Sequence, residues 1–166
     1  MKVNIALLTV TDTRTIDNDK SGGILVNKIK EANHNLIDRK ICKDNKDEIV
    51  IILKEWLKNE KIDAIITTGG TGLTGRDITP EALNEVAEKH IPGFGEIFRN
   101  ISIKTVGTSA IQSRACAVLS NGKYIFALPG SSGGVTDAWE GILKHQLDIN
   151  HKPCNFVELF PRLKEK

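Results

Sequence analysis

The chain repeats one pattern: a short apolar run ends in a polar stretch, and a segment with apolar residues at helical spacing follows. Val3–Val10 reads VNIALLTV, Lys61–Thr68 reads KIDAIITT, and Tyr124–Leu128 is a third such run. Near-continuous apolar runs of this length are typical of parallel strands that helices cover on both faces. Strands that alternate with helices imply right-handed crossovers. The pattern therefore predicts an α/β fold with a mostly parallel sheet.

Weaker patterns predict the remaining elements. Asn35–Ile41 is expected to form a short strand, and the tail from His151 to Lys166 is expected to be irregular. Thr79 with Pro80 and Glu81 has the features of a helix start: a hydroxyl N-cap, a proline and an acid at the positive end of the dipole. Helical spacing predicts further helices over four segments, Ile24–Glu31, Glu48–Leu57, Ile91–Lys104 and Val135–Leu147.

Size and composition limit the classes of protein. The 166 residues suit one domain, residues 1–166, because a second core would have too few residues. A net charge of +2 gives no basic field for nucleic acid. No run of about 20 apolar residues or cleavable leader is present, so neither a membrane protein nor a secreted one is expected. Three widely spaced cysteines argue against a disulfide framework or zinc ribbon and suit a reducing cytoplasm.

Three loops rich in Gly, Ser, Thr and Asp follow the predicted strands. Loops after parallel strands emerge at one edge of the sheet, which is the usual ligand site in open α/β folds. A phosphate requires bare backbone N–H groups, close approach and a helix dipole, and such loops supply all three. The strongest is Thr67–Glu81, TTGGTGLTGRDITPE. A mobile turn is the alternative interpretation.

Gly70, Gly72 and Gly75 satisfy the GxGxxG pattern of dinucleotide-binding proteins. The context fits poorly, because the helix is expected near Pro80 and no acid ends a strand about 20 residues later. A P-loop is excluded because no Lys-Ser or Lys-Thr follows the glycines. The loop is therefore predicted to bind phosphate in another way.

Two carboxylates are expected beside the phosphate loops. Asp77 lies just beyond the glycines and Asp44 just beyond the second strand. Such a pair can hold Mg²⁺, which prefers one or two carboxylates plus water and substrate phosphates. The alternatives are a solvated N-cap for Asp44, and capping or pairing with Arg76 for Asp77.

The last strand runs into Pro129–Gly134, PGSSGG, which repeats the phosphate-loop composition before a helix predicted to begin at Val135. A tight turn without a ligand is the alternative. The four histidines, His34, His90, His145 and His151, show no metal-ligand spacing.

Several long motifs, in order along the chain, resemble the MoaB/Mog family of molybdenum-cofactor biosynthesis proteins. They read TTGGTGLTGRDITPEAL, IPGFGEIFR, GTSAIQSRA, FALPGS and, near the end, KPCNF. The resemblance implies a three-layer α/β/α sandwich that binds molybdopterin and assembles into homotrimers or homohexamers, with other cofactor-biosynthesis proteins as further partners. Helical spacing puts Phe94, Ile97, Phe98 and Ile101 on one face of the segment Ile91–Lys104, and its apolar excess is expected to face a partner subunit.

Catalytic members of that family adenylylate molybdopterin with MgATP and release pyrophosphate. Carried over by position, Asp77 and Asp44 would act in catalysis and hold the metal. The phosphate-holding residues would be Thr68, Gly69, Gly70, Thr71 and Gly72, completed by Pro129, Gly130, Ser131 and Ser132. With a pterin as ligand, the carboxylate of Asp12 is expected to accept two hydrogen bonds from its amino-pyrimidine edge, with ordinary capping as the alternative.

The last loop departs from part of this pattern. It reads PGSSGG, whereas the Mog-type enzymes frequently carry a PGxPK form, and the KPCNF tail resembles the MoaB branch. Asp44 and the Arg76–Asp77 pair match the active pattern, which favours molybdopterin adenylyltransferase. The alternatives are a non-catalytic molybdopterin-binding or scaffold protein and, less favoured, another nucleotide-processing enzyme.

Overall fold

The computed structural model describes residues 1–165, and its centre is one six-stranded sheet with the order β2-β1-β3-β6-β5-β4. The first four strands in this order pair in parallel, while β5 and β4 are antiparallel. This confirms the predicted α/β fold with a mostly parallel sheet. The strands are β1 (Asn4–Val10), β2 (Asn35–Cys42), β3 (Ala64–Thr68), β4 (Lys89–His90), β5 (Cys116–Ser120) and β6 (Lys123–Leu128).

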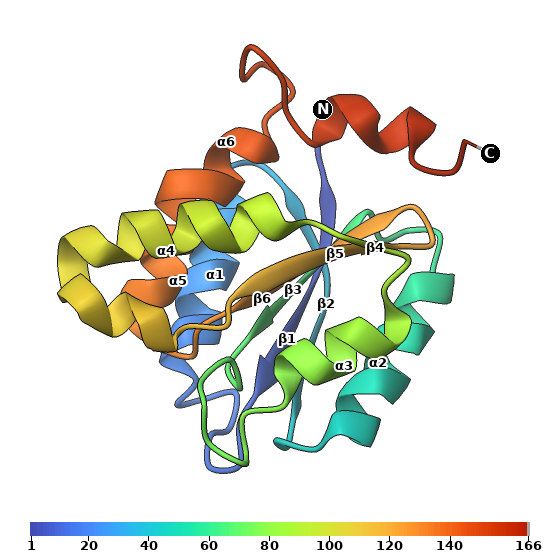
Figure 1. The fold of residues 1–166 in the computed structure, drawn as a ribbon. Coiled ribbons are helices and arrows are strands. Elements are labelled where there is room, and N and C mark those ends of the chain that lie inside the picture. Colours follow the sequence, from blue (N-terminus) through green and yellow to red (C-terminus); the bar gives the residue numbers. More distant parts are fainter. Residues whose placement is uncertain (166) are drawn as a thin grey trace.

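Helices cover both faces of the sheet and make three layers (Figure 1). One face carries α1 (Lys20–Glu31), α4 (Pro92–Val106) and α5 (Ser132–Ala138), and the other carries α2 (Lys46–Lys58) and α3 (Thr79–Val86). The three-layer sandwich implied by the resemblance is thus confirmed. Four shorter helical segments complete the chain: η1 (Gly107–Gln112), the π-helical η2 (Trp139–Leu143), α6 (Lys144–Gln146) and η3 (Val157–Arg162).

The apolar run of β1 is buried on both of its faces. Ile5 and Leu7 belong to the core under α1, α4 and α5, whereas Ala6 and Leu8 belong to the core under α2 and α3. Successive side chains of a strand point to opposite faces, so a run without polar residues is needed where both faces are covered. The central strands are therefore fixed between two cores, and the loops that follow them begin from rigid positions.

Two helices begin three or four residues earlier than their sequences predict, because glycines occupy their first turns. α1 begins at Lys20 rather than Ile24, and the buried carboxylate of Asp19 caps it by accepting from the Gly22 N–H at 2.9 Å. α5 begins at Ser132 rather than Val135, and the Ser131 hydroxyl accepts from the Gly134 N–H at 3.1 Å. A satisfied N-cap offsets the low helix propensity of glycine.

The helix α3 begins where it was predicted to begin, but its N-cap residue differs from the predicted one. Ile78 occupies the N-cap position and makes no side-chain capping bond. The hydroxyl of Thr79 instead donates to the carbonyl oxygen of Gly69 at 2.8 Å. Thr79 therefore ties the helix to the glycine loop, and the prediction of a threonine N-cap was wrong.

The segment after β4 was predicted as a short amphipathic helix, and α4 extends two residues further, to Val106. Phe94 and Phe98 are buried in the core of the same chain, whereas Ile97 is 54% exposed. The two phenylalanines therefore belong to the core of this chain, and of these three residues only Ile97 is available to a partner subunit.

Two other regions differ from their predictions. The tail was expected to be irregular, but it contains η3, and the rings of Phe156 and Phe160 pack on Tyr124 at centroid distances of 4.6 and 5.6 Å. The strands β4 and β5 were not predicted. Among residues 1–165, the helices are all too short or too polar to cross a membrane.

Candidate functional site

The four parallel strands end at one edge of the sheet, and the candidate site is built from the loops that follow them. These loops are residues 11–19 after β1, 43–45 after β2, 69–78 after β3 and 129–131 after β6 (Figure 1). The order β2-β1-β3-β6 places the loops after β1 and β6 on either side of the glycine loop after β3. Segments far apart in the sequence thus meet at a position typical of α/β ligand sites.

The glycine loop, residues 69–78, requires glycine at its start. Gly69 and Gly70 have φ angles of +102° and +68°, which side chains rarely adopt. A Cβ atom at Gly69 would lie 2.2 Å from the carbonyl oxygen of Val10, and one at Gly70 would lie 3.2 Å from Oδ1 of Asp44. The loop therefore lies directly against β1 and the Asp44 carboxylate.

The glycine loop and the loop after β6 are in backbone contact. The Thr68 hydroxyl donates to the Pro129 carbonyl oxygen at 2.7 Å, and the Gly69 N–H donates to the Leu128 carbonyl oxygen at 3.0 Å. A Cβ atom at Gly130 would lie 3.2 Å from the Gly69 Cα. The two predicted phosphate loops thus form one surface.

Arg114 holds the far side of the glycine loop. Its guanidinium donates from Nε to the Gly72 carbonyl oxygen at 2.7 Å, from Nη2 to the Asp77 carbonyl oxygen at 2.8 Å, and to the Glu81 carboxylate. The backbone N–H of Arg114 donates to the Thr71 carbonyl oxygen at 2.8 Å. Arg114 lies in the GTSAIQSRA motif, but sequence reasoning gave it no role, because nothing local indicates which backbone it reaches.

Asp12 is paired with Arg76. Two nitrogens of the Arg76 guanidinium lie 2.8–3.0 Å from the Asp12 carboxylate oxygens. The hydrogen bond from Arg76 lowers the pKa of Asp12. Both carboxylate oxygens are in use, so the predicted contact of Asp12 with a pterin edge would require Arg76 to move away. Asp12 also accepts from the Asp44 N–H at 3.1 Å but caps no helix, because the N-cap of α1 is Asp19.

Asp44 lies beside Asp12 in a half-buried position. Burial raises its pKa, and the negative charge of Asp12 raises it further. The N-cap of α2 is Asn45, whose side chain accepts from the Glu48 N–H at 3.1 Å, so the N-cap alternative for Asp44 was wrong. The positive charge of Arg76 lowers the pKa of Asp44 but offsets the effects of burial and Asp12 only in part, so the ionised form of Asp44 is incompletely compensated.

Asp77 is hydrogen-bonded within its own loop. Its Oδ2 accepts from the Thr74 N–H at 2.8 Å and from the Thr74 hydroxyl at 2.7 Å. Burial opposes ionisation of Asp77, but these hydrogen bonds outweigh it and lower the pKa. A Cβ atom at Gly72 would lie 2.8 Å from Oδ2, so Asp77 lies directly against the glycine loop. The alternative of pairing with Arg76 was wrong, since Arg76 pairs with Asp12.

Two clefts open at this edge and share Gly70, Gly130 and Ser131. The first, of about 650 Å³, has Thr71, Gly72, Asp77 and Pro129 on one side. Its other wall comes from α4 and η1, which sequence reasoning did not connect to the site: Phe98, Ser102, Thr105, Val106, Ser109, Ala110, Gln112 and Ser113. The second, of about 370 Å³, is lined mainly by polar residues of the loops after β1 and β6, with Asp44, Thr68 and Gly69 between them.

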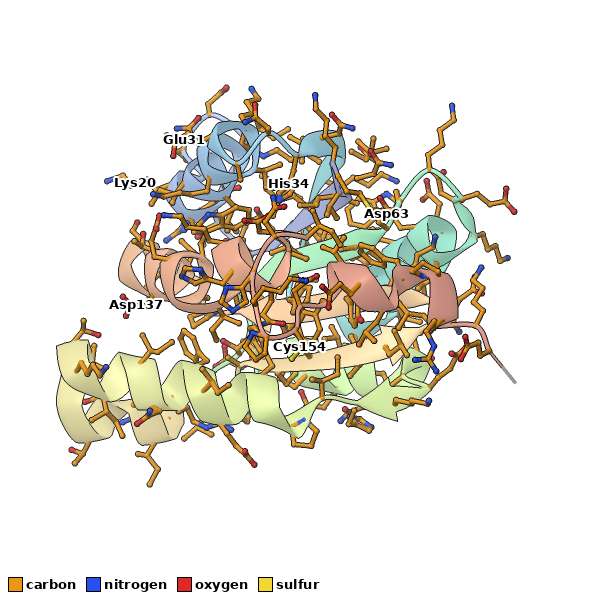
Figure 2. The ribbon with its side chains drawn as sticks, turned by 90° about the horizontal axis from the view of Figure 1, so that it is seen from above. Lys20, Glu31, His34, Asp63, Asp137 and Cys154 are labelled. Atoms are coloured by element: carbon orange, nitrogen blue, oxygen red, sulfur yellow. The ribbon has the colours of Figure 1, made fainter. Side chains whose placement is uncertain are left out.

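The wall made by α4 and η1 is tied to α5. The hydroxyl of Thr105 donates to Oδ2 of Asp137 at 3.1 Å. Asp137 lies on α5 at the end of the molecule where α4 ends (Figure 2). The first cleft is therefore closed on that side by a polar contact between two helices.

The structure brings most of the predicted residues to the clefts. Asp44, Asp77, Thr68 to Gly72 and Pro129 to Ser131 line one or both, whereas Asp12 and Ser132 line neither. Ser132 is in the first turn of α5. Within residues 1–165, no three His, Cys, Asp or Glu side chains are grouped so that they could hold a metal ion by themselves.

Comparison with known proteins gives a consistent result. Residues 6–149 match the family model described as a probable molybdopterin binding domain. The chain is 42% identical over 161 residues to molybdenum cofactor biosynthesis protein B of Escherichia coli strain K12, covering 97% of this chain and 93% of the relative. It is 45% identical over 149 residues to the Staphylococcus aureus strain MRSA252 protein of the same name, covering 88% of each. A crystal structure of a molybdenum cofactor biosynthesis protein B superposes with a TM-score of 0.89 at 35% identity, over 100% of this chain and 98% of the other.

Proposed function

The chain belongs to the MoaB/Mog family of molybdenum cofactor biosynthesis proteins, and from this premise we propose that it is a molybdopterin adenylyltransferase. The observation that carries the proposal is the meeting of two clefts at Gly70, Gly130 and Ser131, with Asp44 and Asp77 against the glycine loop. A transferase that joins two phosphorylated substrates requires two adjoining sites with their phosphates at the junction.

The two clefts differ in a way that suits two substrates. The first is the larger and has Phe98, Val106 and Ala110 in its wall, which suits the ring system of molybdopterin. The second is smaller and more polar, which suits the phosphates of a nucleotide. At the junction, Gly70 and Gly130 carry no side chain and permit close approach of both phosphates.

In the proposed reaction an oxygen of the terminal phosphate of molybdopterin attacks the α-phosphorus of ATP. The bond from that phosphorus to the oxygen bridging to the β-phosphate breaks, and pyrophosphate leaves with the electron pair. The chain's own contribution is to position the phosphates and to supply oriented N–H and hydroxyl dipoles. The contacts of Thr79 and Arg114 with the glycine loop hold those groups in place before the substrates arrive.

The residues present fit a magnesium ion. Arg76 compensates the charge of Asp12, whereas burial and Asp12 raise the pKa of Asp44, and a cation would relieve both effects. Asp44 and Asp77 lie against neighbouring glycines of one loop, and Mg²⁺ prefers one or two carboxylates plus substrate phosphates. When bound there, Mg²⁺ would neutralise charge that develops on the leaving pyrophosphate.

The test is pyrophosphate release by purified protein given molybdopterin, ATP and Mg²⁺. We expect Asp44→Asn and Asp77→Asn to lower the rate by roughly 100-fold or more, because each removes a charge that the metal requires. Asparagine keeps an oxygen that can accept from Thr74, so the loop stays in place. Asp47→Asn, on the exposed side of α2, is the matched control and should be active. Release of no pyrophosphate by the wild-type protein would overturn the proposal.

A non-catalytic molybdopterin-binding or scaffold role is the second candidate. The observation that favours it is the loop after β6, which reads PGSSGG and has no lysine. Tight binding of molybdopterin without release of pyrophosphate would support this role.

The rate of transfer is expected to depend on pH through Asp44. Its pKa is raised, whereas those of Asp12 and Asp77 are lowered, so Asp44 is the first of the three to be protonated as the pH falls. Protons should therefore compete with Mg²⁺ for Asp44 before they compete for Asp77, and transfer should fall on the acidic side as Asp44 loses the metal. The contribution of Asp44 to the stability of the ligand-free protein should change in the opposite sense, because its pKa is raised in the folded state and folding is favoured as it gains its proton, whereas Asp12 and Asp77, with lowered pKa values, contribute the reverse. Chemical denaturation at several pH values, with Asp44→Asn for comparison, measures the second effect.

We also propose that the chain forms a homo-oligomer, a trimer or a hexamer. Four apolar side chains on α4 and η1 are more than half exposed: Ile97 (54%), Ile103 (54%), Val106 (51%) and Ile111 (82%). Apolar residues gathered on one projecting helical segment are typical of a subunit interface. Sedimentation equilibrium tests the proposal, and a monomer at all concentrations would contradict it.

A further inference from the structure

The second cleft contains two charged side chains, Arg14 and Asp44. Arg14 lies on the loop after β1, and its Nη1 is 3.4 Å from the Gly130 carbonyl oxygen and 3.5 Å from the Ser21 hydroxyl. Both are long contacts with neutral groups, and a guanidinium has five N–H donors. Most of the hydrogen-bonding capacity of Arg14 is therefore unused.

The other arginines near the site are already neutralised. Arg76 pairs with Asp12, and Arg114 pairs with Glu81. Behind the loop, Arg39 pairs with the buried Asp19. Among the described residues that line the second cleft, Arg14 is the one cation, and no carboxylate of residues 1–165 lies within 4.0 Å of it. A triphosphate in this cleft would meet the charge of Arg14 uncompensated.

The backbone that carries Arg14 is held in place. The N–H groups of Thr13 and Arg14 both donate to the Thr11 hydroxyl at 3.3 Å, and the Thr15 N–H donates to the Asn18 side chain at 2.7 Å. Beyond these residues, the loop ends at the Asp19 cap of α1. The guanidinium thus extends from a fixed turn toward the loop after β6.

Ser131, next to the Gly130 that Arg14 contacts, has a hydroxyl proton to donate. Its oxygen accepts from the Gly134 N–H at 3.1 Å as the cap of α5, and this leaves its own O–H free. The contact of Arg14 with Gly130 places the guanidinium beside this loop, and Gly69 and Gly70 add no side chains to the floor of the cleft. A phosphate in this cleft could thus contact the guanidinium and the hydroxyl together.

We propose that Arg14 binds the β- and γ-phosphate groups of the nucleotide in the second cleft, an inference that rests on the proposed adenylyl transfer. The planar fork of a guanidinium can give two parallel hydrogen bonds to one phosphate. Asp44 shares the cleft and, without a metal ion, repels a polyphosphate, so the positive charge of Arg14 offsets this repulsion and strengthens nucleotide binding. The positive charge of Arg14 would also stabilise the negative charge that develops on the leaving pyrophosphate.

The experiment measures nucleotide affinity apart from catalysis. Isothermal titration calorimetry with ATP, ADP and AMP, without molybdopterin, compares the wild-type protein with Arg14→Gln and Arg14→Lys. We expect Arg14→Gln to weaken ATP binding by roughly 10- to 100-fold, the effect of one charge-assisted contact, and AMP binding by less. Arg14→Lys keeps the positive charge but loses the planar guanidinium, so its ATP affinity should lie between those of the wild-type protein and Arg14→Gln. Arg162→Gln removes an exposed arginine of η3 and should bind ATP normally.

The outcomes separate this inference from the proposed function. Equal ATP affinity of the wild-type protein and Arg14→Gln, with transferase activity intact in both, would overturn the role of Arg14 alone. A wild-type protein that binds no ATP would overturn both. An equal loss of affinity for ATP and AMP would also contradict the inference, because Arg14 would then not contact the phosphates that distinguish the two. Thermal unfolding of each variant checks that a loss of affinity is not a loss of fold.

Discussion

The loop after β3 and the loop after β6 have nearly the same composition but are held by different physical means. In residues 69–78, Gly69 and Gly70 have a positive φ and lie against Val10 and Thr79, and distant side chains fix the loop. Residues 129–134 comprise the loop after β6 and the first turn of α5, which begins at Ser132. None of the glycines among them has a positive φ. Glycine content alone therefore does not distinguish a rigid loop from a helix start. Substitutions in the two regions should distinguish them.

The largest effect is expected at Gly69. Alanine there would have to adopt a φ near +102° and would place its Cβ atom 2.2 Å from the Val10 carbonyl oxygen. We expect Gly69→Ala to lower the free energy of unfolding by at least about 3 kcal/mol, since neither the loop nor β1 can shift cheaply. Urea denaturation measures this loss in the free energy of unfolding. A loss below about 1 kcal/mol would mean that the loop after β3 is as adaptable as the loop after β6.

The strands and helices that flank these loops were only partly predictable from sequence. The apolar runs gave β1, β3 and β6 within three residues of their observed starts and at their observed ends, because a strand buried on both faces needs such a run. The starts of α1 and α5 were wrong because Gly22, Gly23, Gly133 and Gly134 were interpreted as loop residues. Their caps, Asp19 and Ser131, compensate for those glycines, and the balance is set by hydrogen bonds that composition does not report.

The site was predictable in its loops but not in its pairings. Loops after parallel strands must share an edge, so Asp44, Asp77 and the glycines could be placed together. That Arg76 pairs with Asp12, 64 residues away, depends on how two loops bend and has no local signal. The same is true of the wall that α4 and η1 give to the first cleft.

The next largest effect is expected at Arg114, the side chain that holds the loop after β3. Arg114→Met keeps the length of the side chain but removes its hydrogen bonds to the carbonyls of Gly72 and Asp77 and its ion pair with Glu81. We expect a loss of about 2–3 kcal/mol in the free energy of unfolding. Arg162→Met is the matched control, because Arg162 is an exposed surface arginine, and its effect should stay within about 0.5 kcal/mol. Equal effects of the two variants would show that Arg114 does not hold the loop.

A smaller effect is expected at the cap of α5. Ser131→Ala removes the hydroxyl that accepts from the Gly134 N–H, and the loss of an N-cap costs about 1 kcal/mol. Ser132→Ala, one residue further, removes a hydroxyl outside the capping position and should change stability by less than about 0.5 kcal/mol. Thermal unfolding of both variants makes the comparison. A larger loss for Ser132→Ala would contradict the observed start of the helix.

The smallest effect, and one of opposite sign, is expected at Gly133. A Cβ atom there would meet no atom within 4 Å, and the residue lies in the first turn of α5. Alanine restricts the unfolded chain and favours the helix, so Gly133→Ala should raise the free energy of unfolding by about 0.5 kcal/mol. Gly134→Ala is the control, because its Cβ atom would lie 2.8 Å from the Ser131 hydroxyl oxygen and from Cβ of Pro129, and it should destabilise the protein. If Gly133→Ala were instead as damaging as Gly69→Ala, the loop after β6 would depend on glycine as the loop after β3 does, and the two loops would not differ in kind.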